Sequence, residues 1–235
     1  MNVQGYLDYI NAPWGRLFYR LVWQGLPFEG KTVLDFGSGF GVTASHLAAN
    51  NEVFAVEPNQ EMLDHRVTEH PYTQLTGGIE TLTQFSDGMF DVILCHNVLE
   101  YVENREALLQ EFSRLLKSGG ILSVVKHNPA GKILQKAVFE NDTEAALALL
   151  QGEQAVSENF GDVREYTEEE LAAWCGKSYR TEKRCGIRIF YGLQRNDFKH
   201  EPGWEDRLYD LECAVSEQSP FADIAFFHHV MMKKT

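Results

Sequence analysis

VLDFGSGFG, the stretch from Val33 to Gly41, decides the fold of this chain. The apolar run before it ends in the acid Asp35, and glycines then stand at alternate positions, 37, 39 and 41. Helix-forming residues follow from Val42 to Ala49. This order predicts a strand, a tight glycine turn and a helix, which is where an α/β sheet receives an adenosine-type ligand. Glycine permits positive φ there and lets the backbone approach the ligand closely.

Two acids indicate which ligand that is. Glu57 ends the next apolar run, about twenty residues after the turn, where a carboxylate can accept hydrogen bonds from both ribose hydroxyls. Asp35 closes the first strand, where it would repel the pyrophosphate of a dinucleotide. S-adenosylmethionine has no phosphate, and its ammonium and sulfonium groups favour nearby acids. The G-x-G-x-G spacing also differs from the dinucleotide pattern G-x-G-x-x-G. We therefore expect S-adenosylmethionine as the cofactor, with S-adenosylhomocysteine as its product.

Composition is typical of a cytoplasmic enzyme. The 235 residues are 44% hydrophobic, enough for one substantial core. We expect no membrane span, since no apolar stretch approaches the roughly 20 residues required. Four widely spaced cysteines form no C-x-x-C pair, so we expect no metal site. The net charge of -13 argues against a general nucleic-acid binder but leaves room for a local basic surface.

The pattern along the chain alternates strands and helices. We expect leading helices within residues 1–30. Strands are predicted at 32–36, 52–56, 72–76, 90–95, 121–125, 180–191 and 221–232. Helices are predicted at 41–50, 59–66, 105–116 and 203–217, the second of them capped by Asn59. The fold class is α/β and Rossmann-like, a mostly parallel seven-stranded sheet whose last strand is antiparallel.

A helical insertion follows the fifth strand, over about 127–176, with pieces at 130–140, 142–151 and 167–175 and no strand among them. The insertion lies on the side of the sheet where the carboxyl ends of the strands open. Ligands bind on that side in open α/β sheets. We interpret it as a lid over the acceptor pocket; a helical buttress at the sheet edge is the alternative. The whole chain, 1–235, is then one domain.

The chain resembles the class I S-adenosylmethionine-dependent methyltransferases. The resemblance rests on VLDFGSGFG, EPNQEML (57–63), FDVILCHNVLEYV (90–102) and LLKSGGILSVV (115–125). The stretch from His96 to Gly120, KHNPAG (126–131), GIRIF (186–190) and a leader ending in VWQGL are similar to the bacterial tRNA 5-carboxymethoxyuridine methyltransferase branch. That resemblance implies methyl transfer to an oxygen, the carboxylate of a modified tRNA wobble uridine.

The same resemblance implies a donor site. Its cofactor-binding residues would be Arg16, Asp35, Phe36, Gly37, Ser38, Gly39, Glu57, Pro58, Met62, Ile79, Glu80 and His96. Met62 would lie against adenine, although a core-filling methionine is an equal alternative. Ile79 and Glu80 would bracket the adenine ring, where the family usually has Asp. Arg16 would bind the donor carboxylate; Arg20 is also near, and a solvated helix face is the alternative.

The acceptor side is less defined. Lys126, His127, Asn128, Arg188 and Tyr191 are the candidates for positioning the acceptor. A carboxylate acceptor needs no base because it is ionised at neutral pH. Another acceptor would need one, and His127, His96 and Glu100 are the candidates. Cations from Lys177 to Arg188, with Lys126, Lys132 and Lys136, predict a basic rim, although strand alternation divides them between two faces.

Three functions remain open at this point. The first is a methyltransferase acting on a modified tRNA nucleoside or a small carboxylate. The second is a methyltransferase for a small metabolite, which the negative charge favours. The third is a donor-binding module without turnover, against which the intact Gly37, Gly39 and Glu57 argue.

Overall fold

The computed structural model describes residues 3–152, 156–157, 161–162 and 164–235. Residues 1–2 of the predicted leader and 153–155, 158–160 and 163 of the predicted insertion lie outside these described residues. The chain divides into two compact units. We call residues 27–125, 166–183 and 230–235 the sheet unit, and residues 1–26, 126–165 and 184–229 the helical unit.

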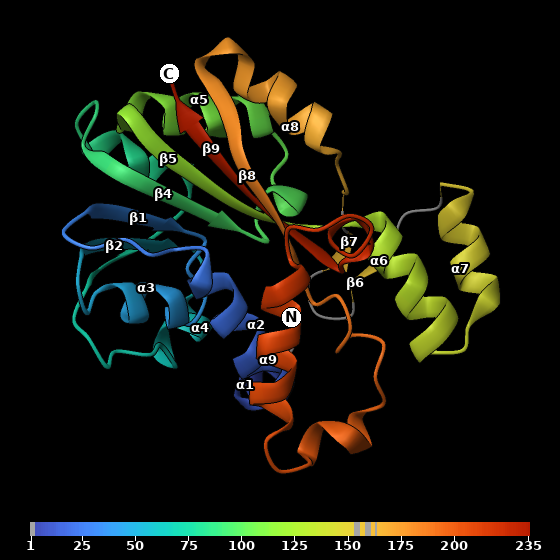
Figure 1. Ribbon diagram of the computed structural model, residues 1–235. Coiled ribbons are helices and arrows are strands. Elements are labelled where there is room, and N and C mark those ends of the chain that lie inside the picture. The colour runs from blue at the N-terminus through green and yellow to red at the C-terminus, as the bar shows by residue number, and fades with distance from the viewer. Residues whose placement is uncertain (1–2, 153–155, 158–160, 163) are drawn as a thin grey trace. The chain divides into compact units, whose positions relative to one another are not determined.

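Seven strands among the described residues form one sheet, in the order β3-β2-β1-β4-β5-β9-β8. The strands are β1 (Thr32–Phe36), β2 (Glu52–Glu57), β3 (Thr73–Thr76), β4 (Phe90–His96), β5 (Leu116–His127), β8 (Tyr179–Ile187) and β9 (Phe227–Lys234). The first five pair in parallel, and β9 runs against β5 (Figure 1). The predicted α/β class and mostly parallel sheet with an antiparallel last strand are confirmed.

Helices of the sheet unit follow the strands they connect. They are α3 (Val42–Leu47), α4 (Gln60–Asp64), α5 (Arg105–Leu115), α8 (Glu168–Cys175) and the 3-10 turns η1 (Ile79–Gln84), η2 (Leu99–Tyr101) and η4 (Gly176–Ser178). Asn59 and Asn104 accept hydrogen bonds from the first turns of α4 and α5, so each helix starts where the sequence predicts. Thr167 and Glu170 form a capping box on α8.

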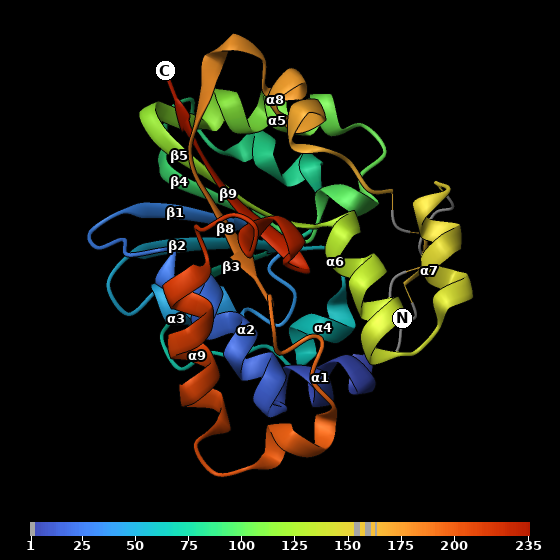
Figure 2. The ribbon, with the colours of Figure 1, turned by 45° about the vertical axis from the view of Figure 1, so that its right-hand side comes forward.

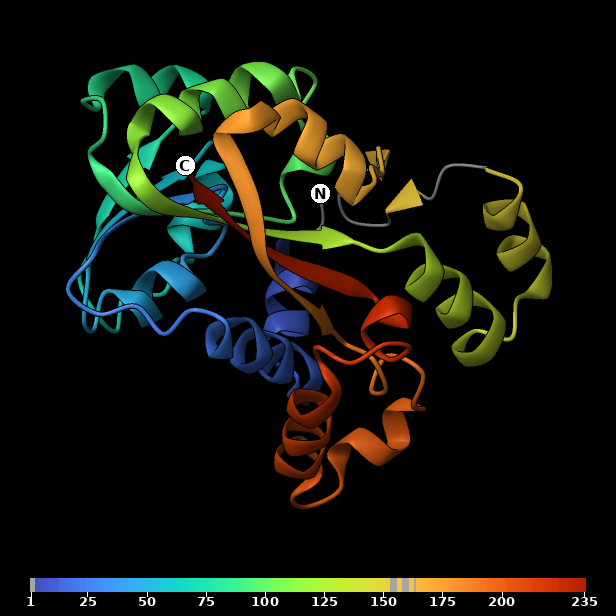
Figure 3. The same cartoon turned by 45° about the horizontal axis from the view of Figure 1, so that its top comes forward.

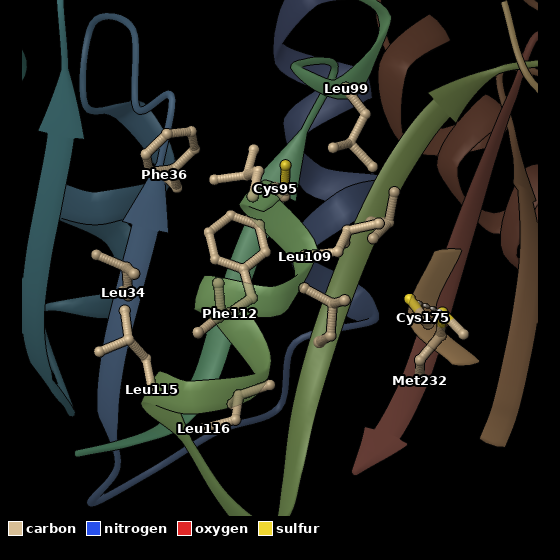
Figure 4. Close-up of a cluster of buried hydrophobic side chains, with 14 of the residues drawn as sticks. Leu34, Phe36, Cys95, Leu99, Leu109, Phe112, Leu115, Leu116, Cys175 and Met232 are labelled. Carbon is tan, nitrogen blue, oxygen red and sulfur yellow. Dashed lines mark hydrogen bonds between the residues drawn. The ribbon is translucent and has the colours of Figure 1, made fainter. Parts of the chain in front are cut away.

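The core of the sheet unit lies between β1, β4, β5 and α5 (Figure 4). Phe36 at the end of β1 meets Phe112 of α5 edge to face, with ring centroids 5.3 Å apart. Helix α8 packs on α5 (Figure 1) and adds Leu171 and Cys175 to this core. The last helix of the predicted 127–176 insertion therefore belongs to the sheet unit.

The helical unit contains the remaining elements. They are α1 (Val3–Asn11), α2 (Pro13–Gln24), α6 (Pro129–Leu134), the π-helix η3 (Gln135–Phe139), α7 (Thr143–Leu150), β6 (Val156–Ser157), β7 (Gly161–Asp162), η5 (Asn196–His200), α9 (Trp204–Val215) and η6 (Ala222–Ile224). Helix α2 packs against α1 and α9 (Figure 2). Helix α7 turns back along α6 and η3 (Figure 3).

Several predicted boundaries are wrong for local reasons. The insertion does contain strands, since β6 and β7 form a short antiparallel pair. The strand predicted at 180–191 ends at Ile187 because Arg188 has a φ of 64°. The strand predicted at 221–232 starts at Phe227 because Ala222–Ile224 forms a 3-10 turn. Strand β5 starts at Leu116, paired with Phe90, and runs through Gly119 and Gly120 rather than beginning after them.

Candidate functional site

The turn after β1 has the backbone that its glycines predict. Gly37, Gly39 and Gly41 have φ values of 77°, 55° and 69°, all in the left-handed region. A Cβ on Gly37 would lie 2.3 Å from Cγ2 of Val98, so sterics as well as conformation require glycine there. Gly41 is the N-cap of α3, which then begins at Val42. The predicted strand, glycine turn and helix are all present.

A Gly37→Ala substitution should destabilise the protein by more than the strain of placing alanine at a positive φ. Gly30→Ala is a matched control, because Gly30 has a φ of 64° with nothing within 4 Å of a new Cβ. We expect about 1–2 kcal/mol for the strained backbone in both variants. Gly37→Ala should cost about 1–3 kcal/mol more for the clash with Val98. Urea unfolding measures both, and equal losses would contradict the close packing of this turn.

The turn is attached to β2 through its amides. The N–H groups of Gly37 and Ser38 both donate to the carbonyl oxygen of Val56, at 2.8 and 3.1 Å. The backbone groups that this segment can offer to a ligand are therefore its carbonyl oxygens. Carbonyls are acceptors, which suits the ammonium group of an amino-acid portion.

Glu57 lies at the end of β2, beside the glycine turn. Its Oε2 accepts from the N–H of Gly39 and its Oε1 from the N–H of Asn59, both at 2.9 Å. The residue is only 7% exposed, so these bonds fix its position. Each carboxylate oxygen has two lone pairs, so Glu57 can accept further hydrogen bonds from ligand hydroxyls. Pro58, which follows, is exposed.

Asp35 is the second acid at this edge of the sheet. Strands β1 and β2 are parallel and in register from Thr32–Glu52 to Phe36–Val56, so Asp35 and Glu57 come out at the same edge. Asp35 is 4% exposed. Burial, and then the negative charge of Glu57, raise the pKa of Asp35 to about 7, although a hydrogen bond from the Ala44 backbone opposes the rise. Two neighbouring acids at a glycine turn fit a nucleoside that carries positive charge and repel one that carries phosphate.

The predicted adenine contacts lie near the same turn. Met62 is buried, and its Cε would be 3.7 Å from a Cβ on Gly39, so packing and ligand contact are both open to it. Ile79, after β3, is 39% exposed, which is unusual for a large apolar residue. Glu80 accepts from the N–H of Gly78 at 2.7 Å, which lowers the pKa of Glu80. Glu80 therefore holds its own turn in place.

His96 ends β4 and contacts the neighbouring strand. Its Nε2 lies 2.8 Å from Oγ of the buried Ser123 on β5. Asn97, next to it, has a φ of 55° and donates its N–H to Val125. Glu100, a candidate base from sequence, is 1% exposed and so is shielded from solvent. Asp35, Glu57, Met62, Ile79, Glu80 and His96 all belong to the sheet unit.

Arg16 and Arg20 belong instead to the helical unit, on α2. Arg16 binds Glu205 through Nη2 at 3.2 Å and donates from Nη1 to the carbonyl of Asn11 at 2.6 Å. Arg20 binds Glu205 and Asp206, both at 2.9 Å. Both arginines thus connect α2 to α9 within this unit, and a donor contact by Arg16 would compete with its bond to Glu205.

The segment after β5 combines packing roles with candidate roles. Lys126 is buried and donates to the carbonyl of His127 at 2.8 Å. The ring of His127 lies 4.9 Å from that of Phe227. The amide of Asn128 donates to the carbonyls of Asp223 and Ala225, and its oxygen caps α6. This use of the whole side chain gives Asn128 a structural role.

Arg188 has a well-defined setting inside the helical unit. Its Nη2 donates to Oε1 of Gln135 at 3.0 Å, and its guanidinium lies 4.3 Å from the ring centre of Phe226. Its Nε is buried and has no hydrogen-bond partner among the described residues. A buried donor without a partner is costly, and an incoming acceptor would satisfy it.

A residue that the sequence did not indicate holds this segment. Glu212 of α9 is fully buried and accepts from the backbone N–H groups of Ile189, Phe190 and Tyr191, at 2.8, 2.8 and 3.2 Å. Burial raises the pKa of Glu212, although these bonds oppose the rise. The only available signal was an acid on the apolar face of a predicted helix. Glu212 fixes the backbone that carries Arg188 and Tyr191.

Several cations of the predicted basic rim form ion pairs with acids. Arg184 pairs with Asp223, Lys132 with Glu165 and Arg180 with Glu182. Such pairs reduce the positive field available to a phosphate backbone. Within the described residues there is no group of three or more His, Cys, Asp and Glu that could hold a metal ion. Nor is any helix of that part long and apolar enough to span a membrane.

Comparison with known proteins also indicates a methyltransferase. Residues 34–124 match the family model described as a methyltransferase domain. The chain is 24% identical to the tRNA 5-carboxymethoxyuridine methyltransferase of Escherichia coli, over 94% of this chain and 89% of that protein. It is 32% identical to a ubiquinone biosynthesis O-methyltransferase of Caulobacter vibrioides, over 47% of this chain and 46% of that protein.

Solved structures agree on the fold. An S-adenosylmethionine-dependent methyltransferase from Thermotoga maritima has a TM-score of 0.68 at 19% identity, over 99% of this chain and 96% of that chain. One from Archaeoglobus fulgidus has a TM-score of 0.61 at 15% identity, over 97% and 99%. The solved structures show the fold alone. The chain is an S-adenosylmethionine-dependent methyltransferase, as shown by the domain match at residues 34–124, the relatives named as methyltransferases, and the glycine turn with its two acids.

Proposed function

We propose that this enzyme transfers a methyl group from S-adenosylmethionine to a carboxylate oxygen of a modified wobble uridine in tRNA, in the cytoplasm. The observation that carries the proposal is Arg188, whose buried Nε lacks a partner among the described residues. A guanidinium is suited to a carboxylate, which it can bind through two parallel hydrogen bonds. The similarity to the E. coli enzyme over 94% of the chain supports this acceptor.

We further propose how the donor is held. The carbonyls of Phe36, Gly37 and Ser38 would accept from its ammonium group, since the amides of Gly37 and Ser38 are already bonded. Glu57 would accept from the ribose hydroxyls, and Met62, Ile79 and Glu80 would border the adenine. His96 would contact the donor from the end of β4.

The chemistry requires little from side chains. A carboxylate oxygen attacks the methyl carbon, the new C–O bond forms, and the electron pair of the breaking C–S bond goes to sulfur. The products are a neutral methyl ester and the thioether S-adenosylhomocysteine. No proton moves, because the carboxylate is already ionised at neutral pH. Alignment of oxygen, methyl and sulfur can supply most of the acceleration.

The raised pKa of Asp35 predicts pH-dependent donor binding. In the free enzyme Asp35 is mostly protonated below about pH 7 and ionised above it. A cationic donor favours the ionised form, so affinity should rise by up to about tenfold per pH unit below 7 and then level off. The same shift should lower the free energy of unfolding as pH rises from about 4 to about 7.

Calorimetry between pH 5.5 and 8.5 measures the effect on donor binding. Asp35→Asn should remove the dependence, because an amide does not titrate in this range. Glu52→Gln is the control, since Glu52 begins β2 at the far end of the strand and is exposed. An unchanged pH profile in Asp35→Asn would show that another group titrates.

A small-metabolite acceptor is the second candidate. The net charge of -13 and the pairing of Lys132, Arg180 and Arg184 with acids favour it over a polyanionic substrate. The Caulobacter relative, a ubiquinone biosynthesis O-methyltransferase, also supports it, although it matches less than half of the chain.

One experiment separates the two acceptors. Bacterial tRNA containing 5-carboxymethoxyuridine is incubated with the enzyme and a donor labelled in its methyl group, and the nucleosides are analysed by mass spectrometry. We expect the label in a methyl ester that mild alkali releases as methanol. No label in tRNA, with label in a metabolite extract, would replace the tRNA proposal by the small-molecule one.

A further inference from the structure

A second cation lies close to Arg188 within the helical unit. Lys199, on η5, is only 4% exposed, which is rare for a lysine. Arg188 and Lys199 both contact η3: Arg188 donates to Gln135, and the ammonium of Lys199 lies 5.1 Å from the ring centre of Phe139. Arg188 and Lys199 thus place two positive charges beside η3.

The surroundings of Lys199 do not neutralise it. Its Nζ donates to Oδ1 of Asn196 at 3.0 Å, and the ring centre of Trp14 lies 5.7 Å away. Burial, and then the charge of Arg188, lower the pKa of Lys199 to about 8. Burial is the main cause of that shift, and the positive charge of Arg188 adds to it. In the described part of the chain, no carboxylate forms an ion pair with either of them.

Two polar groups nearby also lack a hydrogen-bond partner among the described residues. The hydroxyl of Tyr191, a fully buried residue, has no hydrogen-bond partner among the residues described, and neither has Nε of Arg188. Tyr191 lies beside Arg188, whose guanidinium is 5.7 Å from its ring centre. Glu212 is the nearby acid: its charge interacts with that of Arg188, but its recorded hydrogen bonds come from the backbone of residues 189–191 and it forms no ion pair with Arg188. Two donors without acceptors and two cations without ion pairs describe a site made for an oxyanion.

We propose that Lys199, together with Arg188 and Tyr191, forms a binding site for the oxyanion of the methyl acceptor, and that Lys199 is the residue that selects acceptors carrying that charge. Naming the oxyanion as the acceptor's carboxylate rests on the proposed function; the site itself rests on this cluster. The guanidinium supplies direction, the ammonium supplies a second charge, and the tyrosine hydroxyl donates to a remaining lone pair.

Charge selection has a consequence for turnover. The acid substrate carries a negative charge and its methyl ester does not. The two cations therefore favour the substrate over the product, and esterification weakens the binding of what has just been made. An enzyme with only one of the cations would distinguish the acid from its ester less well.

Stability distinguishes this proposal from a merely structural role for Lys199. A cation buried without an ion pair is unfavourable for folding, so Lys199→Met should leave the melting temperature unchanged or raise it. Binding of an oxyanion should be weakened tenfold or more in the same variant. If Lys199 served packing alone, Lys199→Met would leave oxyanion binding intact, and that result would overturn the proposal.

The binding test uses simple probes on the full chain. Acetate and inorganic phosphate are titrated in turn, and the Nε–H signal of Arg188 is followed by ¹⁵N NMR. We expect saturable shifts with at least one probe, a Kd raised tenfold or more in Lys199→Met, and binding restored in Lys199→Arg. Arg195→Met is the matched control, because Arg195 is exposed and pairs with Asp197 on the surface. Acetate binding more tightly identifies a carboxylate site, and phosphate binding more tightly identifies a phosphate site.

A second arm measures catalysis and separates failure of the site from failure of the proposed function. With the acid nucleoside in tRNA, Lys199→Met should raise KM tenfold or more and change kcat much less. An active enzyme with an unchanged KM in this variant would overturn the site alone. Probe binding that depends on Lys199, in an enzyme that does not esterify tRNA, would overturn the tRNA acceptor and leave the site in place.

Discussion

Replacing Glu57 with alanine should weaken the binding of S-adenosylmethionine by about tenfold or more, which corresponds to about 1.4 kcal/mol. The carboxylate is proposed to accept from both ribose hydroxyls, and a hydrogen bond to a charged group contributes about 1.5–3 kcal/mol. The substitution also removes the acceptor for the N–H groups of Gly39 and Asn59, so the glycine turn loses its anchor. Isothermal calorimetry with S-adenosylmethionine measures the loss.

Two controls make this result specific. Glu52→Ala removes an acid from the other end of β2 and should leave donor affinity unchanged. Glu57→Gln preserves size and one acceptor oxygen, so its affinity should fall between those of the wild type and Glu57→Ala. Donor affinity that stays constant in folded Glu57→Ala would remove Glu57 from the donor site.

Replacing Arg188 with alanine should reduce kcat/KM for a carboxylate acceptor by about a hundredfold, near the lower end of what loss of one partner in a buried charge pair costs. Donor affinity should stay within about twofold, because the side-chain contacts of Arg188 are to Gln135, Tyr191 and Phe226 and not to the residues proposed to hold the donor. Arg188 has a φ of 64°. Alanine, like arginine, is an L-residue with a Cβ, so the backbone strain at this position is similar in the wild type and in Arg188→Ala. Steady-state kinetics with a radiolabelled methyl donor measures the loss.

Arg188→Lys tests whether geometry or charge matters more. An ammonium cannot form the two parallel hydrogen bonds of a guanidinium, so this variant should recover only part of the activity. Arg195→Ala, on the exposed surface, should retain full activity. Normal turnover of a carboxylate acceptor by Arg188→Ala would exclude Arg188 from the acceptor site and withdraw the observation on which the proposed acceptor depends.

The sheet could be predicted from sequence because its signals are local. The run FDVILC in β4 is buried almost throughout, as expected for a central parallel strand. Asn59 and Asn104 cap α4 and α5 with their side chains. An asparagine just before a helical apolar pattern indicates such a helix start. The glycine turn was predictable for the same reason, since positive φ at Gly37, Gly39 and Gly41 is a property of single residues.

The acceptor side was harder because its features depend on distant parts of the chain. Lys199 is buried by Trp14 and Phe139, which are 185 and 60 residues away in sequence, and no local pattern indicates such an environment. Glu212 resembles an ordinary helix acid until its oxygens meet the backbone of residues 189–191. The strand at 180–191 was predicted too long because it ends at the positive φ of Arg188, and an arginine in the sequence does not indicate positive φ.

The most direct measurement is a crystal structure of the enzyme with S-adenosylhomocysteine. The ribose hydroxyls should lie within hydrogen-bond distance of the Glu57 carboxylate, and the amino-acid portion should lie over the backbone of Phe36 to Ser38. A nucleoside bound elsewhere, or a glycine turn blocked by protein atoms in the complex, would contradict the account.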